Sequence, residues 1–271
     1  MDFIQYLQTF ADTKFMLFFA FVIGSMFGSF FNVCIYRLPE ELSVIKPRSF
    51  CPSCKKTIPW YYNIPLLSYI FLRGKCAYCG ARISFRYFFV ELLSAWIFAF
   101  GVYRFGPTFK ALEFIVLSSI MLILFFTDLD KRILPDEITL GFIPVGLIFA
   151  YFSPERTLTE SLIVGIAGAG ILFLLAYIYL KLKGIEGMGM GDVKMLALMG
   201  TFLGKQAFLA LMIASVIGTI VGLFIIYVLK KGKNYEIPFG CFLSIASVIT
   251  YLYGNDIILF YVKHFLKHNW S

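Results

Sequence analysis

Long apolar blocks separated by short polar segments constrain this 271-residue chain more than any other feature. Several blocks are long enough to cross about 30 Å of hydrocarbon. The chain is 60% apolar and only 15% charged, whereas a soluble domain is usually about 45–50% apolar and about 25% charged. Soluble, disordered and fibrous proteins are therefore excluded. Because lipid offers no partners to backbone N–H and C=O groups, the blocks predict an all-α polytopic membrane protein.

We expect about eight transmembrane helices. They are residues 15–36, 88–102, 111–127, 138–152, 162–180, 193–203, 207–229 and 238–261. The first block lacks the short apolar core and cleavage site of a removable signal peptide, so we expect it to be retained. The pattern divides the chain into a first span (residues 1–36), a polar loop (37–87) and a membrane core (88–271).

The basic residues predict an orientation. With the spans above, 17 of the 24 Lys and Arg residues fall on one side, nine of them in the loop 37–87. The basic side of a membrane protein is usually cytoplasmic, so we expect a cytoplasmic first loop in a multi-pass protein of the inner membrane. The net charge of +8 is then a topology signal, and we expect lipid rather than nucleic acid as a partner.

Two C-x₂-C pairs lie in the first loop. Cys51 and Cys54 form one, Cys76 and Cys79 the other, and 21 residues separate the pairs. Four thiolates suit a tetrahedral Zn²⁺ ion with no open position for substrate, and a loop of about 50 residues is too small for a secure core of its own. We therefore predict a structural zinc site. The alternatives are unmetallated thiols or a redox pair, although cytoplasmic thiols stay reduced.

Acidic residues mark two predicted helix ends on the same side of the membrane. Asp128 closes the third span, and Asp192, 64 positions later, opens the sixth. Two carboxyl groups brought within a few Å share one proton, which leaves one base and one acid. That combination can activate water against a peptide carbonyl. The alternative is that Asp128 is an interfacial cap and Asp192 an N-cap. The dipole of its own helix favours Asp192 as the ionised base.

Glycines precede the second acid at positions 187, 189 and 191. Glycine permits close backbone approach, so an extended substrate strand could lie against this segment.

The sequence resembles the type IV prepilin peptidases, a family of bifunctional leader peptidases and N-methyltransferases. The resemblance extends over nearly the whole chain and rests on motifs in the family's order. They are residues 28–37, the cysteine pairs, Trp60, Asn63-Ile64-Pro65, Arg73-Gly74-Lys75, Arg86-Tyr87 with Glu91, Asp128 with Pro135-Asp136, and the G-x-G-D-V-K motif at 189–194.

The resemblance implies a membrane aspartyl protease with Asp128 and Asp192 as its catalytic pair. Such enzymes remove the short basic leader of a prepilin or pseudopilin at the cytoplasmic face. They then methylate the new N-terminal residue with S-adenosylmethionine. It further implies that the zinc-bound loop holds the methyl donor, with Arg86 and Glu91 as possible contributors; otherwise these two are a positive-inside arginine and a helix-end carboxylate.

Two other classes stay open on the residues alone. A transporter can also carry intramembrane acids and interrupted helices, and a thiol-redox membrane protein could use the cysteine pairs.

Overall fold

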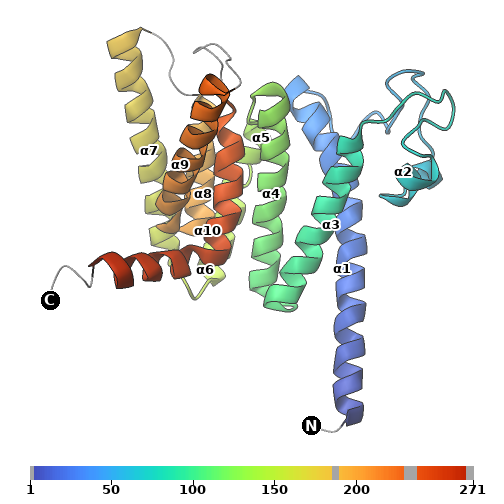
Figure 1. Cartoon of the computed structure of the whole chain (residues 1–271), viewed down its shortest axis with the longest axis horizontal. Coiled ribbons are helices and arrows are strands. Elements are labelled where there is room, and N and C mark those ends of the chain that lie inside the picture. Colours follow the sequence, from blue (N-terminus) through green and yellow to red (C-terminus); the bar gives the residue numbers. More distant parts are fainter. Residues whose placement is uncertain (1–2, 185–188, 229–236, 267–271) are drawn as a thin grey trace. The chain divides into compact units, whose positions relative to one another are not determined.

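The computed structural model describes residues 3–184, 189–228 and 237–266, which form helices joined by turns and loops (Figure 1). The predicted all-α class is confirmed, since the described part of the chain contains isolated β-bridges but no strand. The chain divides into two compact units, Met1–Ile123 and Leu124–Ser271, which we call unit 1 and unit 2. The division into residues 1–36, 37–87 and 88–271 stays a prediction.

Unit 1 begins with two long helices and the cysteine loop between them. Its elements are α1 (Phe3–Arg37), η1 (Leu38–Glu40), η2 (Trp60–Tyr62), α2 (Leu67–Phe71), α3 (Phe85–Phe105) and the first part of α4 (Phe109–Lys131). Unit 2 holds the end of α4 and the remaining helices. They are α5 (Asp136–Thr139), α6 (Ile143–Phe152), α7 (Leu158–Lys183), α8 (Met190–Leu203), α9 (Gln206–Tyr227), α10 (Phe239–Tyr261) and η3 (Val262–Leu266).

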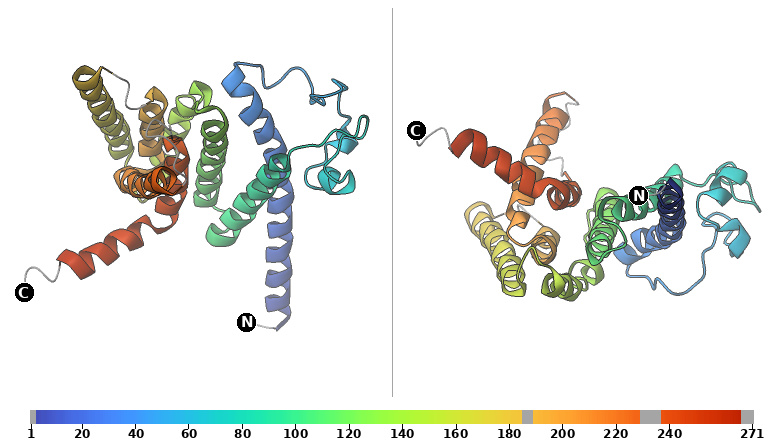
Figure 2. Two further views of the ribbon diagram at one scale, coloured as in Figure 1. Left: turned by 45° about the horizontal axis from the view of Figure 1, so that its top comes forward. Right: turned by 90° about the horizontal axis from the view of Figure 1, so that it is seen from below.

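In unit 1, α1 packs along α3 (Figure 2). The helices approach closely because small residues face α3. A Cβ on Gly24 would lie 2.7 Å from the Ser94 carbonyl oxygen, and a Cβ on Gly28 would lie 2.6 Å from the Glu91 Cα atom. This is the small-x-x-x-small packing of membrane helices. It places the end of α1 beside the start of α3, and the cysteine loop connects these two ends (Figure 1).

The core of unit 2 is α8, which contacts α5, α6, α7, α9 and α10. Met195, Leu198, Met199 and Phe202 on this helix are fully buried. A helix that is apolar on every side belongs inside a protein or in lipid. Asp192 lies in the first turn of this helix, where Gly191 packs against Leu134.

Among the described residues, six helices are long and apolar enough to cross a membrane. They are Asp12–Glu40, Phe85–Phe105, Phe109–Lys131, Leu158–Lys183, Gln206–Tyr227 and Phe239–His264. The predicted count of eight is not confirmed, because the segments predicted at 138–152 and 193–203 form shorter helices. The first is divided into α5 and α6, and the second is the 14-residue α8. At about 1.5 Å per residue, α8 is too short for the hydrocarbon layer.

Candidate active site and metal centre

The first candidate site, in unit 2, contains both predicted catalytic acids. Asp128 lies near the end of α4 and is 6% exposed, whereas Asp192 is half-buried in the first turn of α8. The two acids are 64 positions apart in the sequence, and both lie in unit 2, at the end of α4 and at the start of α8.

The Asp128 carboxyl group lies against the first turn of α10. Its Oδ2 atom accepts a hydrogen bond from the backbone N–H of Cys241 at 3.0 Å. A Cβ on Gly240 would lie 2.9 Å from the same oxygen, so only glycine leaves room for it. The first N–H groups of a helix lack partners within the helix. Asp128 therefore supplies from α4 the acceptor that an N-cap side chain normally provides.

Leu134 packs against the starts of α8 and α10. A Cβ on Gly191 would lie 3.0 Å from Leu134 Cβ, and a Cβ on Gly240 would lie 3.1 Å from Leu134 Cδ2. The starts of α8 and α10 therefore lie on the same apolar side chain, which follows Asp128 closely in the sequence. Nearby, the Lys194 ammonium group lies 2.7 Å from the exposed Asp136 carboxylate. Of the predicted glycine segment, Gly187 lies outside the described residues.

The second candidate site, in unit 1, contains the four cysteines of the loop. Their sulfur atoms all lie within 4.8 Å of one another, and the Cys51 and Cys79 sulfurs are 3.9 Å apart. Tetrahedral zinc with bonds of about 2.3 Å would place its sulfur ligands about 3.8 Å apart. The donor set and its spacing therefore fit a metal ion of this kind.

The two cysteine pairs have similar backbones. The residue after each pair, Lys55 or Gly80, has a positive φ angle, 58° and 70° respectively. The N–H of Lys55 donates to the Cys51 carbonyl, and that of Gly80 donates to the Cys76 carbonyl. Hydrogen bonds, first from the backbone N–H of Cys54 and then from Ser53 and neighbouring thiols, lower the pKa of the Cys51 thiol to about 6. Burial and the neighbouring thiols raise the pKa of the Cys79 thiol to about 11.

A cavity of about 390 Å³ lies beside the cysteine cluster, between the loop and the ends of α1 and α3. Its lining includes Cys51, Cys76, several tyrosines and Glu91. This volume is within the range of about 300–1,000 Å³ that is usual for small-molecule sites.

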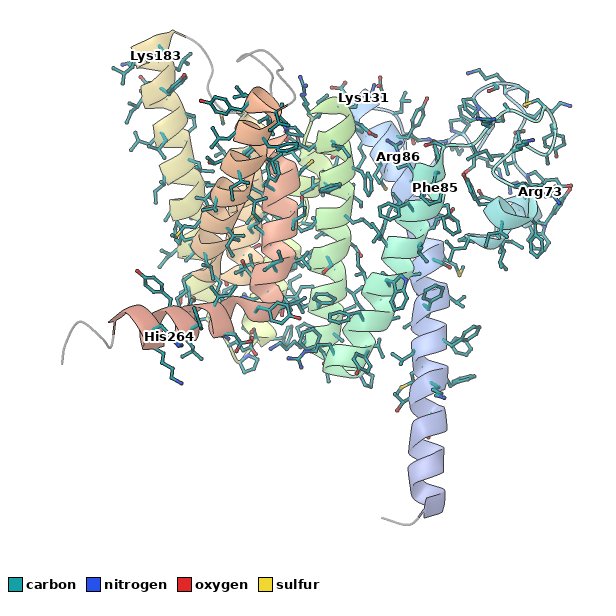
Figure 3. The ribbon with its side chains drawn as sticks, viewed as in Figure 1. Arg73, Phe85, Arg86, Lys131, Lys183 and His264 are labelled. Carbon is teal, nitrogen blue, oxygen red and sulfur yellow. The ribbon has the colours of Figure 1, made fainter. Side chains whose placement is uncertain are left out.

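The two residues predicted to contribute to a methyl-donor site differ in position. Glu91 lines the cavity, whereas Arg86 does not. The Glu91 Oε2 atom accepts a hydrogen bond of 2.7 Å from the N–H of Leu66, a residue with a φ of 61°. Arg86 lies in the first turn of α3, and its guanidinium carbon is 5.9 Å from the centre of the Tyr87 ring (Figure 3). Glu91 thus joins the loop to α3.

Sequence reasoning did not find the contact between Asp128 and α10. Pro238 and Gly240 mark the start of a helix, and this signal is present in the sequence. No local signal indicates which side chain meets that helix start, because Asp128 and Cys241 are 113 positions apart.

Two family models match the chain. The bacterial peptidase A24 N-terminal domain matches residues 22–105, and the type IV leader peptidase family matches residues 115–223. No solved structure matches.

Several curated relatives are similar over most of their length, and each is called a prepilin leader peptidase/N-methyltransferase. The relative from Aeromonas hydrophila is 36% identical, over 91% of this chain and 93% of its own length. The relative from Bacillus subtilis is 36% identical, over 92% of this chain and 98% of its own length. The relative from Neisseria gonorrhoeae is 33% identical, over 92% of this chain and 94% of its own length. These similarities do not favour a transporter or a thiol-redox protein. The chain belongs to the type IV leader peptidase family.

Proposed function

We propose that this protein removes the leader peptide of a prepilin or pseudopilin and methylates the new N-terminal residue. The proposal is supported by the positions of the two acids in unit 2 of a chain of this family. Asp128 binds the start of α10, and Leu134 packs against both that helix start and the start of α8, which carries Asp192. Two neighbouring carboxyl groups that share a proton are the equipment of an aspartyl protease. Unit 1, with its metal-binding cysteines and adjacent cavity, is the candidate for the methyl-transfer site.

In the proposed cleavage, Asp128 is the base and Asp192 carries the shared proton. A hydrogen bond to a carboxylate favours its ionised form, and the N–H of Cys241 donates such a bond to Asp128. Among the described residues, no group donates a hydrogen bond to the Asp192 side chain. The contact with α10 supports the opposite of the assignment that the sequence favours, in which Asp192 is the base because of the dipole of its own helix.

The chemical steps follow from this assignment. Asp128 takes a proton from water, the hydroxide attacks the scissile carbonyl carbon, and Asp192 gives its proton to the carbonyl oxygen. When the tetrahedral intermediate collapses, the C–N bond breaks and Asp128 gives its proton to the leaving nitrogen. Asp192 recovers a proton from the hydroxyl group as the carbonyl reforms. The pair is then ready for another substrate.

For the metal centre, we propose that Cys51, Cys54, Cys76 and Cys79 hold a structural Zn²⁺ ion. Four protein ligands leave no open position for substrate. The ion would hold both cysteine turns together in a loop that has few buried apolar residues. In the described range 41–84, Cys51, Gly74 and Cys76 are its only buried residues. It would thereby fix the wall of the adjacent cavity.

For methyl transfer, we propose that the cavity of unit 1 binds S-adenosylmethionine, which supplies an electrophilic methyl group when bound. Glu91 lines this cavity and fits a role there. Arg86 lies outside the lining, and we propose that it acts at the membrane surface or through its neighbour Tyr87.

The protein is a multi-pass membrane protein, and we propose that the cysteine loop and both acids face the cytoplasm. Within unit 2, Lys131 at the end of α4 and Lys183 at the end of α7 lie at the same end, opposite His264 (Figure 3). Basic residues collected at one end support a cytoplasmic position for that end.

The experiment is incubation of the purified protein with a full-length prepilin and labelled S-adenosylmethionine. Leader removal is followed by the change in gel mobility and methyl transfer by the label. We expect both products. Intact prepilin after complete incubation would contradict the protease activity, and a cleaved but unlabelled product would contradict the methyltransferase activity alone.

A further inference from the structure

Asn32, on the last part of α1, has a buried acceptor atom that the fold does not use. The side chain is 3% exposed. Its Nδ2 atom donates to the Tyr87 carbonyl oxygen at 2.9 Å, which fixes the orientation of the amide. Its Oδ1 atom has no hydrogen-bond partner among the described residues. A buried acceptor without a donor is costly, so this atom indicates a ligand.

Glu91 lies about one helical turn from this acceptor. Gly28 on α1 faces the Glu91 backbone on α3. Asn32 follows Gly28 by one turn, and Tyr87, its hydrogen-bond partner, precedes Glu91 by one turn. One turn of helix is about 5.4 Å. Asn32 and Glu91 both line the cavity of unit 1, so an acceptor oxygen and a carboxyl group are neighbours on its helical wall.

This arrangement suits a ligand with several N–H donors and no acceptor. A primary ammonium group has three such donors, and a hydrogen bond from a charged donor is stronger than a neutral one. The basic residue nearest on α1, Arg37, is already engaged: its Nη1 and Nη2 atoms donate to the carbonyl oxygens of Ser43 and Pro47. Asn32 Oδ1 is thus available to an amine. The Glu91 carboxyl group already accepts hydrogen bonds from the Leu66 N–H and the Ser29 hydroxyl, and a carboxylate has about four acceptor positions, so it can accept one more from an amine.

We propose that Asn32 Oδ1 and the Glu91 carboxyl group bind the α-amino group at the N-terminus of the cleaved pilin. This inference rests on the proposed methyltransferase function and names the subsite for the methyl acceptor. Both residues belong to the membrane-spanning helices that form one wall of the cavity. A substrate whose N-terminal segment is an apolar helix in the membrane arrives along that wall, whereas a water-soluble methyl donor enters from the loop side.

The proton and electron balance of the step is simple. The ammonium group gives one proton to Glu91, and Asn32 Oδ1 accepts a hydrogen bond from the amine and orients its lone pair. The lone pair forms the N–CH₃ bond as the C–S bond breaks, and the electrons of that bond go to the sulfur. The sulfonium becomes a thioether, and the methylated amine is the product.

The test compares two peptides that begin with the mature pilin N-terminus, one with a free amine and one N-acetylated. Their affinities are measured for the full-length protein and three variants. For the native protein we expect the free-amine peptide to bind about tenfold or more tightly than the acetylated one, the size of one hydrogen bond to a charged group. We expect Asn32→Leu to reduce this preference to about threefold or less, while affinity for the acetylated peptide and for S-adenosylmethionine stays unchanged.

Two variants exclude a merely structural effect. Asn32→Asp keeps an acceptor oxygen and should keep the preference. Ser94 lies on the same pair of helices but outside the cavity lining, and its buried hydroxyl also lacks a hydrogen-bond partner among the described residues. Ser94→Ala removes this hydroxyl and should keep the preference for the free amine.

Three results would overturn the inference. The first is an unchanged preference for the free-amine peptide in Asn32→Leu, and the second is an equal loss of that preference in Asn32→Leu and Asn32→Asp. The third is loss of S-adenosylmethionine binding in Asn32→Leu, which would assign Asn32 to the methyl-donor site. Failure of the native protein to methylate the free-amine peptide with labelled S-adenosylmethionine would instead refute the proposed methyltransferase activity, and the inference with it.

Discussion

Replacing Gly240 by alanine tests how Asp128 is held. The new Cβ would lie 2.9 Å from Asp128 Oδ2 and 3.1 Å from its Cγ atom, which is closer than atoms tolerate. The carboxyl group would have to leave the N–H of Cys241, its partner at 3.0 Å. A hydrogen bond to a charged group is worth about 1.5–3 kcal/mol. Because each 1.36 kcal/mol is a factor of ten in rate, leader cleavage should fall about 10- to 150-fold.

The assay is the initial rate of leader removal from a purified prepilin, with methyl transfer to a pre-cleaved peptide measured in parallel. Methyl transfer should be unchanged, since Gly240 belongs to unit 2. Gly254→Ala is the matched control: it lies on the same helix, and its Cβ would meet Gln206 Oε1 at 2.8 Å, away from the acids. Native cleavage by Gly240→Ala would refute the role of α10. An equal loss in Gly254→Ala would reduce that role to general packing of the helix.

Two further predictions concern the metal centre and the surface of the active site. We expect elemental analysis to find stoichiometric zinc in the native protein and none in the double variant Cys51→Ser/Cys54→Ser. This variant should also lose S-adenosylmethionine binding, while leader cleavage continues in unit 2. Equal S-adenosylmethionine binding by both proteins would separate zinc from methylation. Lys194→Ala removes an exposed ion pair of 2.7 Å with Asp136. Such pairs contribute about 0–1 kcal/mol, so cleavage should fall by no more than about fivefold, and a larger loss would show that Lys194 itself acts on substrate.

Local features of the sequence predicted the helical class and the composition of both sites. The spacing of the two C-x₂-C pairs was sufficient for the cysteine cluster, because the tight turns at Lys55 and Gly80 are local. The apolar blocks were sufficient for the long helices. The blocks at 138–152 and 193–203 are not confirmed as spans, and their apolar character alone could not decide, since a helix that is buried inside a protein is as apolar as one in lipid. The second of them, α8, is such a helix.

Contacts between distant segments could not be predicted in this way. The meeting of Asp128 with the start of α10 depends on how α4, α8 and α10 pack, and no spacing rule connects residues 113 positions apart. The same holds for Glu91 and Leu66, which join α3 to the loop. The unused acceptor of Asn32 could be recognised only once the cavity and its lining were known.

The central claim is that Asp128 and Asp192 act as one unit in leader cleavage, and a mutant cycle tests it most directly. The measurement is the single-turnover cleavage rate of the native protein, Asp128→Asn, Asp192→Asn and the double variant. Groups that act together are strongly non-additive. We therefore predict that each single variant reduces the cleavage rate to a small residual rate and that the double variant keeps this same residual rate, with methyl transfer to a pre-cleaved peptide retained throughout. A single variant that still cleaves at a substantial rate, or losses that multiply in the double variant, would contradict the shared role of the two acids.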